Sequence, residues 1–339
     1  MKTLRLTLAA TLIALLPAAA EAVLATRTLM PEFIGTHEWA NTVFPLTRAD
    51  LEGNVVLIVF FNHGSLDSYR DLQIANRWFK KYGQRGLTVI GIHSPEFDFE
   101  KNSKAEAAAK TWRIQFPIAM DPELDLWLAY NTHVRPTHFI IDAENLVRGV
   151  FQGRGSYREQ EKMIQDLLRE SGRRLRLKIH AQDKSPEAAA QAASRPIKMG
   201  SRTMSSLGNP GKIRAGTQTY EIPPDLKTEF FYLSGLWTLE EQYLESAGPQ
   251  SAAVILFRGR KIYATLGHQG EGEAEVLLNG KPLTTANRGG NVDLKNGKSY
   301  LVLKGGGLYS VLNERTPAEG KLEIIFGPAP ARVYTVFFE

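Results

Sequence analysis

Two kinds of apolar pattern alternate along residues 54–170. The first is an almost unbroken apolar run, as in Asn54–Phe61, which is typical of a strand buried on both faces. The second has an apolar residue every three or four positions, as in Ser65–Tyr82, and predicts a helix. The strands predicted in this way are 54–61, 87–92, 138–142 and 146–151, and the helices are 65–82, 101–112 and 157–170. Their order predicts an α/β domain with a central mixed sheet flanked by helices.

The pattern changes after residue 201, where short apolar runs are separated by glycine and proline. One of these runs ends at Asn279-Gly280, which is a strong signal for a two-residue hairpin turn. The strands predicted here are 252–257, 261–266, 275–278, 300–303, 308–312, 322–326 and 333–338. Many short strands at this spacing predict an all-β domain, a sandwich or jelly roll, over residues 202–339.

Residues 171–201 lie between the two predicted domains and are polar and alanine-rich, which predicts a linker. Near its start is a basic cluster made of Arg173, Arg174, Arg176 and Lys178. Such a cluster could contact an anionic lipid or polymer. We favour the interpretation that it is the solvated end of a helix.

The N-terminus has the pattern of a secretory signal peptide. Lys2 and Arg5 precede an apolar run at 6–16, and the small residues around Ala20 and Ala22 fit a signal-peptidase site. The run is too short to span a hydrocarbon core of ~30 Å, which weighs against the alternative of a membrane anchor. We therefore expect residues 1–22 to be a signal peptide cleaved between Ala20 and Ala22. The mature protein would be periplasmic or secreted, with its first domain over residues 23–170.

Composition narrows the chemistry that this chain can perform. Lys and Arg number 41 against 36 Asp and Glu, and the small net charge of +5 does not indicate a nucleic-acid partner. The sequence has no cysteine. Disulfides, thiolate nucleophiles, thiolate metal ligands and iron–sulfur clusters are therefore excluded within this chain. We expect no cofactor.

Four segments carry patterns of one known family: residues 31–39, 46–61, 86–101 and 134–142. They resemble the thioredoxin-like redoxin family, in particular its DipZ-type and TlpA-like periplasmic thiol–disulfide proteins, and 86–101 is the most specific match. The resemblance implies a thioredoxin-like fold for the first domain. The all-β segment, through Leu233–Trp237, resembles the carbohydrate-binding-module-like jelly roll that follows the redoxin domain in DipZ-type proteins.

The sequence departs from the family at the redox motif. The family places Cys-x-x-Cys after the first buried strand, whereas Ser65 and Ser68 stand at those two positions here. The usual aromatic neighbours are also missing from residues 62–64, which favours natural divergence over an engineered replacement. Disulfide exchange needs a thiolate, and a helix dipole contributes at most ~2 kcal/mol, far too little to make a serine alkoxide abundant. We therefore expect a degenerate active site without thiol–disulfide activity.

Three interpretations remain open for the loop that carries these serines. The one we favour is that Ser65 caps the helix, its hydroxyl accepting the N–H three residues on. Alternatively, Ser65 or Ser68 is a nucleophile with His63 as its base, although no third group is evidently placed to orient the histidine. A third interpretation is metal binding. The resemblance places the loops of His63, His93 and His138 on one side of the sheet, where they could converge on zinc or copper.

The resemblance also implies a peptide-binding groove. It implies that Pro136 is in the cis form and that the backbone beside it pairs with extended peptides. A groove formed by Asn62, His63, Arg135, Pro136 and Thr137 could therefore hold an envelope protein or peptide. The alternative is a proline turn with a structural role alone.

Aromatic residues of the all-β domain could form a sugar-stacking face, because their rings are apolar and their tips polar. They are also ordinary strand-core residues, which is the interpretation we favour for most of them. The stacking candidates are Tyr232, Trp237 and Tyr263. The function we expect is a redox-inactive protein- or peptide-binding module of the cell envelope. The alternatives are a non-thiol enzyme that uses His63 and Ser65, a glycan-binding envelope protein and a structural envelope protein.

Overall fold

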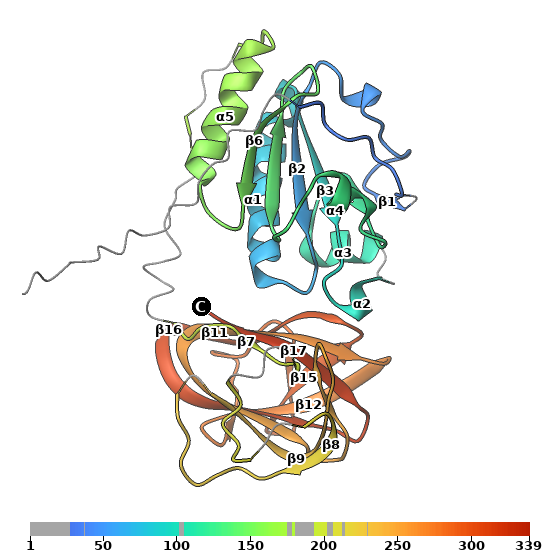
Figure 1. The fold of residues 1–339 in the computed structure, drawn as a ribbon. Coiled ribbons are helices and arrows are strands. Elements are labelled where there is room, and N and C mark those ends of the chain that lie inside the picture. The colour runs from blue at the N-terminus through green and yellow to red at the C-terminus, as the bar shows by residue number, and fades with distance from the viewer. Residues whose placement is uncertain are drawn as a thin grey trace, which may run out of the picture.

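The computed structural model describes residues 28–36, 38–101, 105–174, 178–179, 193–201, 206–211, 214–228 and 230–339. These residues form two domains stacked end to end, an α/β domain drawn in blue to green and an all-β domain drawn in yellow to red (Figure 1). The predicted signal peptide, much of the predicted linker and Arg176 of the basic cluster lie outside the described residues. Within the described part, no helix is both long and apolar enough to cross a bilayer.

The α/β domain is built on a mixed sheet of six strands in the order β1-β4-β3-β2-β5-β6. The strands are β1 (Trp39–Ala40), β2 (Val55–Phe61), β3 (Leu87–His93), β4 (Ile118–Met120), β5 (Thr137–Ile141) and β6 (Val147–Gln152). Strands β2, β3 and β4 run parallel, whereas β1, β5 and β6 each pair antiparallel with their neighbours. The mixed sheet predicted from the apolar runs is confirmed.

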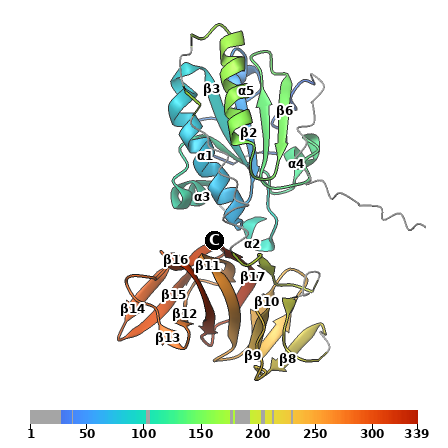
Figure 2. The same ribbon diagram turned by 90° about the vertical axis from the view of Figure 1, so that its left-hand side faces the viewer.

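Both faces of this sheet are covered, as the continuous apolar run of β2 predicts. The helices are α1 (Leu66–Tyr82), α2 (Asp98–Lys101), α3 (Ala105–Trp112), α4 (Asp125–Ala129) and α5 (Tyr157–Glu170), with short 3-10 turns at Ala49–Leu51 and Gly83–Arg85. Leu57 and Val59 pack in one core with residues of α1, α3 and α5, and Ile58 and Phe60 pack on the opposite face with α4. Figure 2 shows α1 and α5 crossing the near face. Successive side chains of a strand point to opposite faces, so β2 must be apolar throughout.

The second domain is one antiparallel system of eleven strands around a single core. Its strands are β7 (Ile197–Lys198), β8 (Gly216–Tyr220), β9 (Phe231–Leu239), β10 (Leu244–Ser246), β11 (Ala252–His268), β12 (Glu271–Leu278), β13 (Lys281–Pro282), β14 (Val292–Lys295), β15 (Lys298–Lys304), β16 (Gly307–Phe326) and β17 (Ala331–Phe338). The all-β prediction is confirmed. The jelly-roll topology stays a prediction.

Two of these strands are longer than the sequence pattern predicts. The expected strands 252–257 and 261–266 are halves of the single strand β11, and 308–312 and 322–326 are both parts of β16. The predicted break at Gly259 is a bulge, because the register between β11 and β16 shifts between Gly259 and Lys261. A bulge bends a strand without ending it. Glycine at such a position therefore resembles a turn signal in the sequence.

Candidate functional site

The loop between β2 and α1 brings the two serines to the start of the helix. Ser65 is the N-cap of α1, and its hydroxyl accepts the backbone N–H of Ser68 at 3.4 Å. The buried hydroxyl of Ser68 donates to Oδ1 of Asn62 at 3.0 Å and accepts the backbone N–H of Asn62 at 3.3 Å. The capping prediction for Ser65 is confirmed. Both hydroxyls thus have structural partners at the positions where the resemblance implies cysteines.

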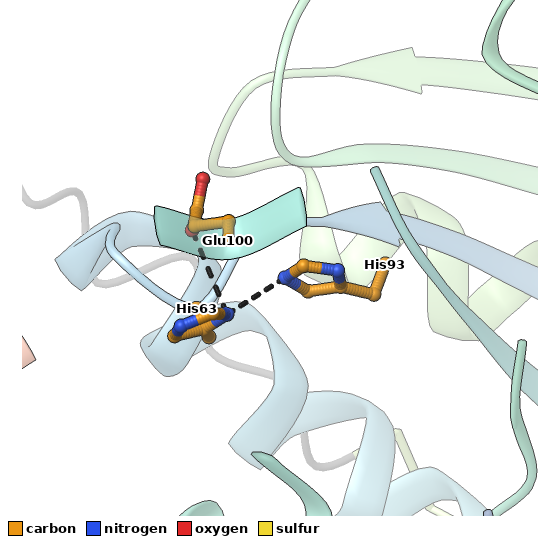
Figure 3. Close-up of side chains that lie close together, drawn as sticks. All are labelled: His63, His93 and Glu100. Carbon is orange, nitrogen blue, oxygen red and sulfur yellow. Dashed lines mark hydrogen bonds and ion pairs between the residues drawn. The ribbon is translucent and has the colours of Figure 1, made fainter. Parts of the chain in front are cut away.

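Three side chains around this loop form the histidine–glutamate cluster, which consists of His63, His93 and Glu100 (Figure 3). His63 lies in the loop after β2, His93 ends β3, and Glu100 belongs to α2. Nδ1 of His63 is 2.8 Å from Nε2 of His93 and 3.7 Å from Oε1 of Glu100. The two imidazole rings are stacked with their centroids 4.9 Å apart. The three ligand-type atoms lie within 4.8 Å of one another.

Glu100 is fixed in this position by the backbone around it. Its Oε1 accepts the N–H of Gly64 at 2.7 Å, and its Oε2 accepts the N–H groups of Glu96 at 2.7 Å and Phe97 at 2.9 Å. These three donors come from the loop after β2 and from the segment that leads into α2. The carboxylate therefore ties together two loops that are distant in sequence.

Burial controls the protonation of the cluster. It lowers the pKa of the His63 imidazole to about 4. The pKa of His93 is also lowered by burial, and further by the neighbouring His63 and Arg135. Burial raises the pKa of the Glu100 carboxyl, and the backbone N–H groups act in the opposite direction because they favour the ionised form. At neutral pH both imidazoles are uncharged, so each ring offers one nitrogen lone pair.

His138 does not join the other two histidines, which corrects the expected set of three. It lies on β5 and is buried, with Nε2 2.9 Å from Oδ2 of Asp71 and Nδ1 close to the side-chain oxygen of Gln160. These partners belong to α1 and α5, so His138 faces the helices that cover the sheet. The third member of the cluster is Glu100. The sequence signal for it was weak, a carboxylate seven positions after His93 in the segment 86–101.

The expected peptide groove is largely occupied by the protein itself. The Arg135–Pro136 peptide bond is cis, as the resemblance implies. Asn62 and Thr137 are fully buried, at 0% exposure each, and Pro136 is buried as well. The guanidinium of Arg135 donates to the carbonyl oxygens of Ser94 and Pro95 and lies 3.8 Å above the Trp127 ring. Of the five expected groove residues, only His63 and Arg135 are partly exposed.

The all-β domain covers the serine-bearing loop. Thr265 in β11 donates its hydroxyl hydrogen to the carbonyl oxygen of Gly64. The rings of Phe97 and Phe99 pack against Tyr334 of β17, with centroid distances of 4.8 and 5.0 Å. We call these three rings the aromatic contact. Ser65, the next residue along this loop, remains partly exposed.

Further contacts join the domains around this point. Leu308 of β16 packs against the core that α1 and α3 share with the sheet. The guanidinium of Arg70 in α1 forms an ion pair with the side chain of Glu339, and the chain end marked C lies between the domains (Figure 1). The domain contact therefore combines apolar packing, ion pairing and a buried hydrogen bond.

A cleft of about 530 Å³ lies beside the covered loop and is lined by both domains. The first domain contributes His63 and, from α3, Thr111 and Trp112. The second contributes two glycine-rich segments, 290–291 and 306–307, together with Asp293, Lys304 and Tyr309. His63 therefore belongs both to the histidine–glutamate cluster and to the wall of this cleft. Sequence reasoning had no means to find the cleft, because it depends on how the domains dock.

The aromatic residues expected to stack on sugars do not form one surface. Trp237 is fully buried and Tyr232 is 2% exposed. The Trp237 ring packs edge-on against Phe326 at 5.6 Å, and its N–H donates to the carbonyl oxygen of Ser234. Tyr263 is partly exposed. The proposed stacking role is therefore corrected for Tyr232 and Trp237, since rings inside a strand core cannot meet a sugar.

Comparison with known proteins assigns both domains. Residues 28–150 match the AhpC/TSA family, and residues 197–338 match the family described as thioredoxin like C-terminal domain. Protein DipZ of Mycobacterium tuberculosis is 30% identical over 259 residues, which are 75% of this chain and 37% of DipZ. The chain thus spans little more than a third of the length of that relative.

Two further matches each cover less than half of this chain. Thiol-disulfide oxidoreductase ResA of Bacillus cereus is 21% identical over 118 residues, covering 35% of this chain and 66% of ResA. A thiol-disulfide isomerase of Corynebacterium glutamicum has a crystal structure that matches with a TM-score of 0.39 and 20% identity, covering 42% of this chain and 96% of that one. The two domains thus match thioredoxin-like families, an AhpC/TSA domain followed by a thioredoxin like C-terminal domain, and the sequence has no cysteine in either.

Proposed function

We propose that this protein is a redox-inactive binding protein of the cell envelope, which holds an extended peptide segment in the cleft between its two domains. One observation carries the proposal: hydroxyls occupy both dithiol positions, the second domain contacts the adjacent Gly64, and a cleft lined by both domains lies open nearby. The proposed binding surface is therefore this cleft, and not the groove beside Pro136 that the resemblance implies.

The loss of redox activity follows from the atoms at the helix start. Exchange proceeds through a mixed disulfide, which a hydroxyl oxygen cannot form. No cysteine elsewhere in the chain can replace the missing pair. The hydroxyls of Ser65 and Ser68 are instead engaged in capping and in the hydrogen bonds to Asn62. The scaffold therefore retains its shape without the chemistry of its relatives.

The cleft suits an extended peptide in three respects. Its volume of about 530 Å³ accommodates several side chains. Glycines 290 and 307 in its wall let a ligand backbone approach closely, because they carry no side chain and no atom lies within 4 Å of where a Cβ would be. Asp293 and Lys304 give the wall charges of both signs, which can orient a polar chain. Main-chain hydrogen bonds would then supply affinity, and the Trp112 and Tyr309 rings would contact apolar side chains.

The proposed location is outside the cytoplasm, and the pattern of residues 1–22 supports it. Fractionation of cells that produce the full chain should recover the protein in the envelope or the medium, shortened at Ala20 or Ala22. A chain that lacks residues 2–22 is the control and should stay in the cytoplasm. Recovery of both forms in the cytoplasm would contradict the proposed location.

Two measurements test the function. In an insulin-reduction assay with dithiothreitol, the mature protein should give no rate above the blank. Peptides selected from a random library on the mature protein should bind by calorimetry, and Gly290→Trp should abolish this binding by filling the cleft. The Cβ of a residue at position 290 meets no atom within 4 Å, so the variant should fold. Lys281→Trp, an exposed position outside the cleft, is the matched control. Insulin turnover, or peptides that bind Gly290→Trp unchanged, would refute the proposal.

A further inference from the structure

We infer that the histidine–glutamate cluster is a binding site for a divalent first-row transition-metal ion of the zinc type, held by Nδ1 of His63, Nε2 of His93 and Oε1 of Glu100. Figure 3 shows the three side chains converging from three different elements. The inference does not depend on the proposed peptide binding. The proposed ion site lies in the wall of the cleft, whereas the proposed peptide binds in the cleft itself.

The distances fit an ion with small adjustments. Zinc bonds of about 2.0–2.1 Å place tetrahedral ligand atoms about 3.3 Å apart. The nitrogens of His63 and His93 are 2.8 Å apart, and Nδ1 of His63 is 3.7 Å from Oε1 of Glu100. The first pair must separate and the second must approach, each by about half an ångström or less at that spacing. The third pair, His93 and Glu100, lies within 4.8 Å and must also close toward that spacing. Side-chain rotation of His63, which is the most exposed of the three, can supply the first two movements.

The donor set is chemically suited to such an ion. Neutral imidazoles and a carboxylate are ligands of zinc and related divalent ions, and two histidines with one glutamate are the protein ligands in one class of three-ligand zinc site. Glu100 brings a negative charge into a buried place, which an ion of charge +2 would offset. The nearby cation Arg135 is shared among the carboxyl groups of Glu96, Glu100 and Asp121, and its guanidinium is fixed on two backbone carbonyls.

The surroundings hold the ligands as the groups around metal ligands commonly do. Three backbone N–H groups fix the Glu100 carboxylate, and Oε1 keeps a second lone pair beside its bond to Gly64. The edge of Phe99 meets the His63 ring with centroids 5.4 Å apart, and Phe99 in turn belongs to the aromatic contact. Phe99 of α2, backed by Tyr334 of the second domain, thus forms an apolar wall beside His63.

Three protein ligands leave a coordination position for water or a ligand atom. His63 lines the cleft, so solvent reaches the cluster from that side. A bound ion would also link the loop after β2 to α2, the two segments that contact the second domain. Ion binding should therefore stabilise the domain contact as well as the loop.

The test uses the untagged mature protein, because a histidine tag would bind the same ions. Calorimetry with zinc chloride should give one ion per chain, and cobalt(II) should give the visible absorption of a low-coordinate nitrogen–oxygen site. His63→Gln and His93→Gln should each weaken binding by more than about tenfold. The matched control is His133→Ala, an exposed histidine outside the cluster, which should bind as the unaltered protein does.

Circular dichroism establishes that each variant is folded. If His93→Gln unfolds, His63→Gln, at a partly exposed position, still decides the question. A folded protein that binds no zinc or cobalt would overturn the inference, as would binding that survives His63→Gln or is lost equally in His133→Ala. Peptide binding measured in excess EDTA separates a failure of this site from a failure of the proposed function.

Discussion

The hydroxyl of Thr265 in β11 donates a hydrogen bond to the backbone carbonyl oxygen of Gly64, which lies 201 residues earlier in the chain. The bond is buried and joins the all-β domain to the loop that carries Ser65. A surface that the family resemblance implies to be open to clients is here an internal contact. The two domains should therefore unfold and bind as a coupled unit.

Replacing Thr265 by valine should weaken the domain contact. Thr265→Val keeps the shape of the side chain but leaves the Gly64 carbonyl without its partner, which costs about 1–3 kcal/mol. Thr265→Ser keeps the hydroxyl and should lose less. Urea unfolding followed by tryptophan fluorescence measures both. Equal loss in the two variants would show that the methyl group, and not the hydrogen bond, stabilises the contact.

Two adjacent glycines provide a sharper comparison. A Cβ added at Gly306 would lie 2.2 Å from Cδ2 of Phe99, whereas a Cβ at Gly307 meets nothing within 4 Å. Gly306→Ala should therefore displace Phe99 and lower the free energy of unfolding by about 1–3 kcal/mol. Gly307→Ala should be neutral or slightly stabilising, because it restricts the unfolded chain. Chemical denaturation of the pair checks this, and similar midpoints would mean that Phe99 does not rest on Gly306.

Substitution of Ser65 distinguishes a cap from a nucleophile. Ser65→Ala removes the acceptor for the Ser68 N–H and should lower the free energy of unfolding by about 1 kcal/mol. Ser65→Gly should cost only a few tenths of a kcal/mol, because glycine is a tolerated N-cap. Thermal or urea unfolding provides the comparison. If Ser65 is only a cap, peptide binding should be unchanged in both variants. If Ser65 were a nucleophile, either substitution would abolish catalytic activity.

Stability should fall at alkaline pH through Tyr334. Burial raises the pKa of the Tyr334 phenol to about 12 against the opposing charge of Arg332, with Tyr243 and Asp98 also facing it. Between an unfolded value of 10.0 and that folded value, the unfolded chain releases the proton and the folded protein retains it. The free energy of unfolding should therefore decrease as the pH rises through this window.

The control for that prediction keeps the ring and removes the ionisable group. Tyr334→Phe should retain the aromatic contact with Phe97 and Phe99 and make the decrease with pH shallower. Urea titrations at a series of alkaline pH values measure the slope. An unchanged slope would assign the effect to other tyrosines.

The sequence predicted the α/β domain well because its signals are local. The apolar run of β2 reflects the burial of all its residues, and the helical spacing of α1 reflects the burial of one face. Strand β11 was divided in the prediction because a bulge and a turn both favour glycine, and β16 was divided where its pairing with β11 skips residues 314–317. Local pattern does not distinguish a strand that bends from one that ends.

The candidate site was only partly predictable, for a different reason. His63 follows β2 and His93 ends the neighbouring parallel strand β3, and the ends of such strands lie on one edge of the sheet. Glu100 was missed because its position depends on backbone hydrogen bonds to Gly64 and Phe97, which no spacing encodes. The domain contact depends on the complementary surfaces of the two domains. No sequence pattern around Thr265 or Gly64 predicts that these two residues will meet.

The serines at the start of α1 have a consequence for how the protein responds to its surroundings. Peroxide oxidises thiols, and glutathione forms mixed disulfides with them, whereas serine hydroxyls undergo neither reaction. A binding surface built beside Ser65 and Ser68 therefore keeps the same state in oxidising and reducing conditions. Such a protein would keep its ligand under oxidising conditions that convert the dithiol of a relative to a disulfide. Its ligand affinity would not depend on the redox potential of its surroundings.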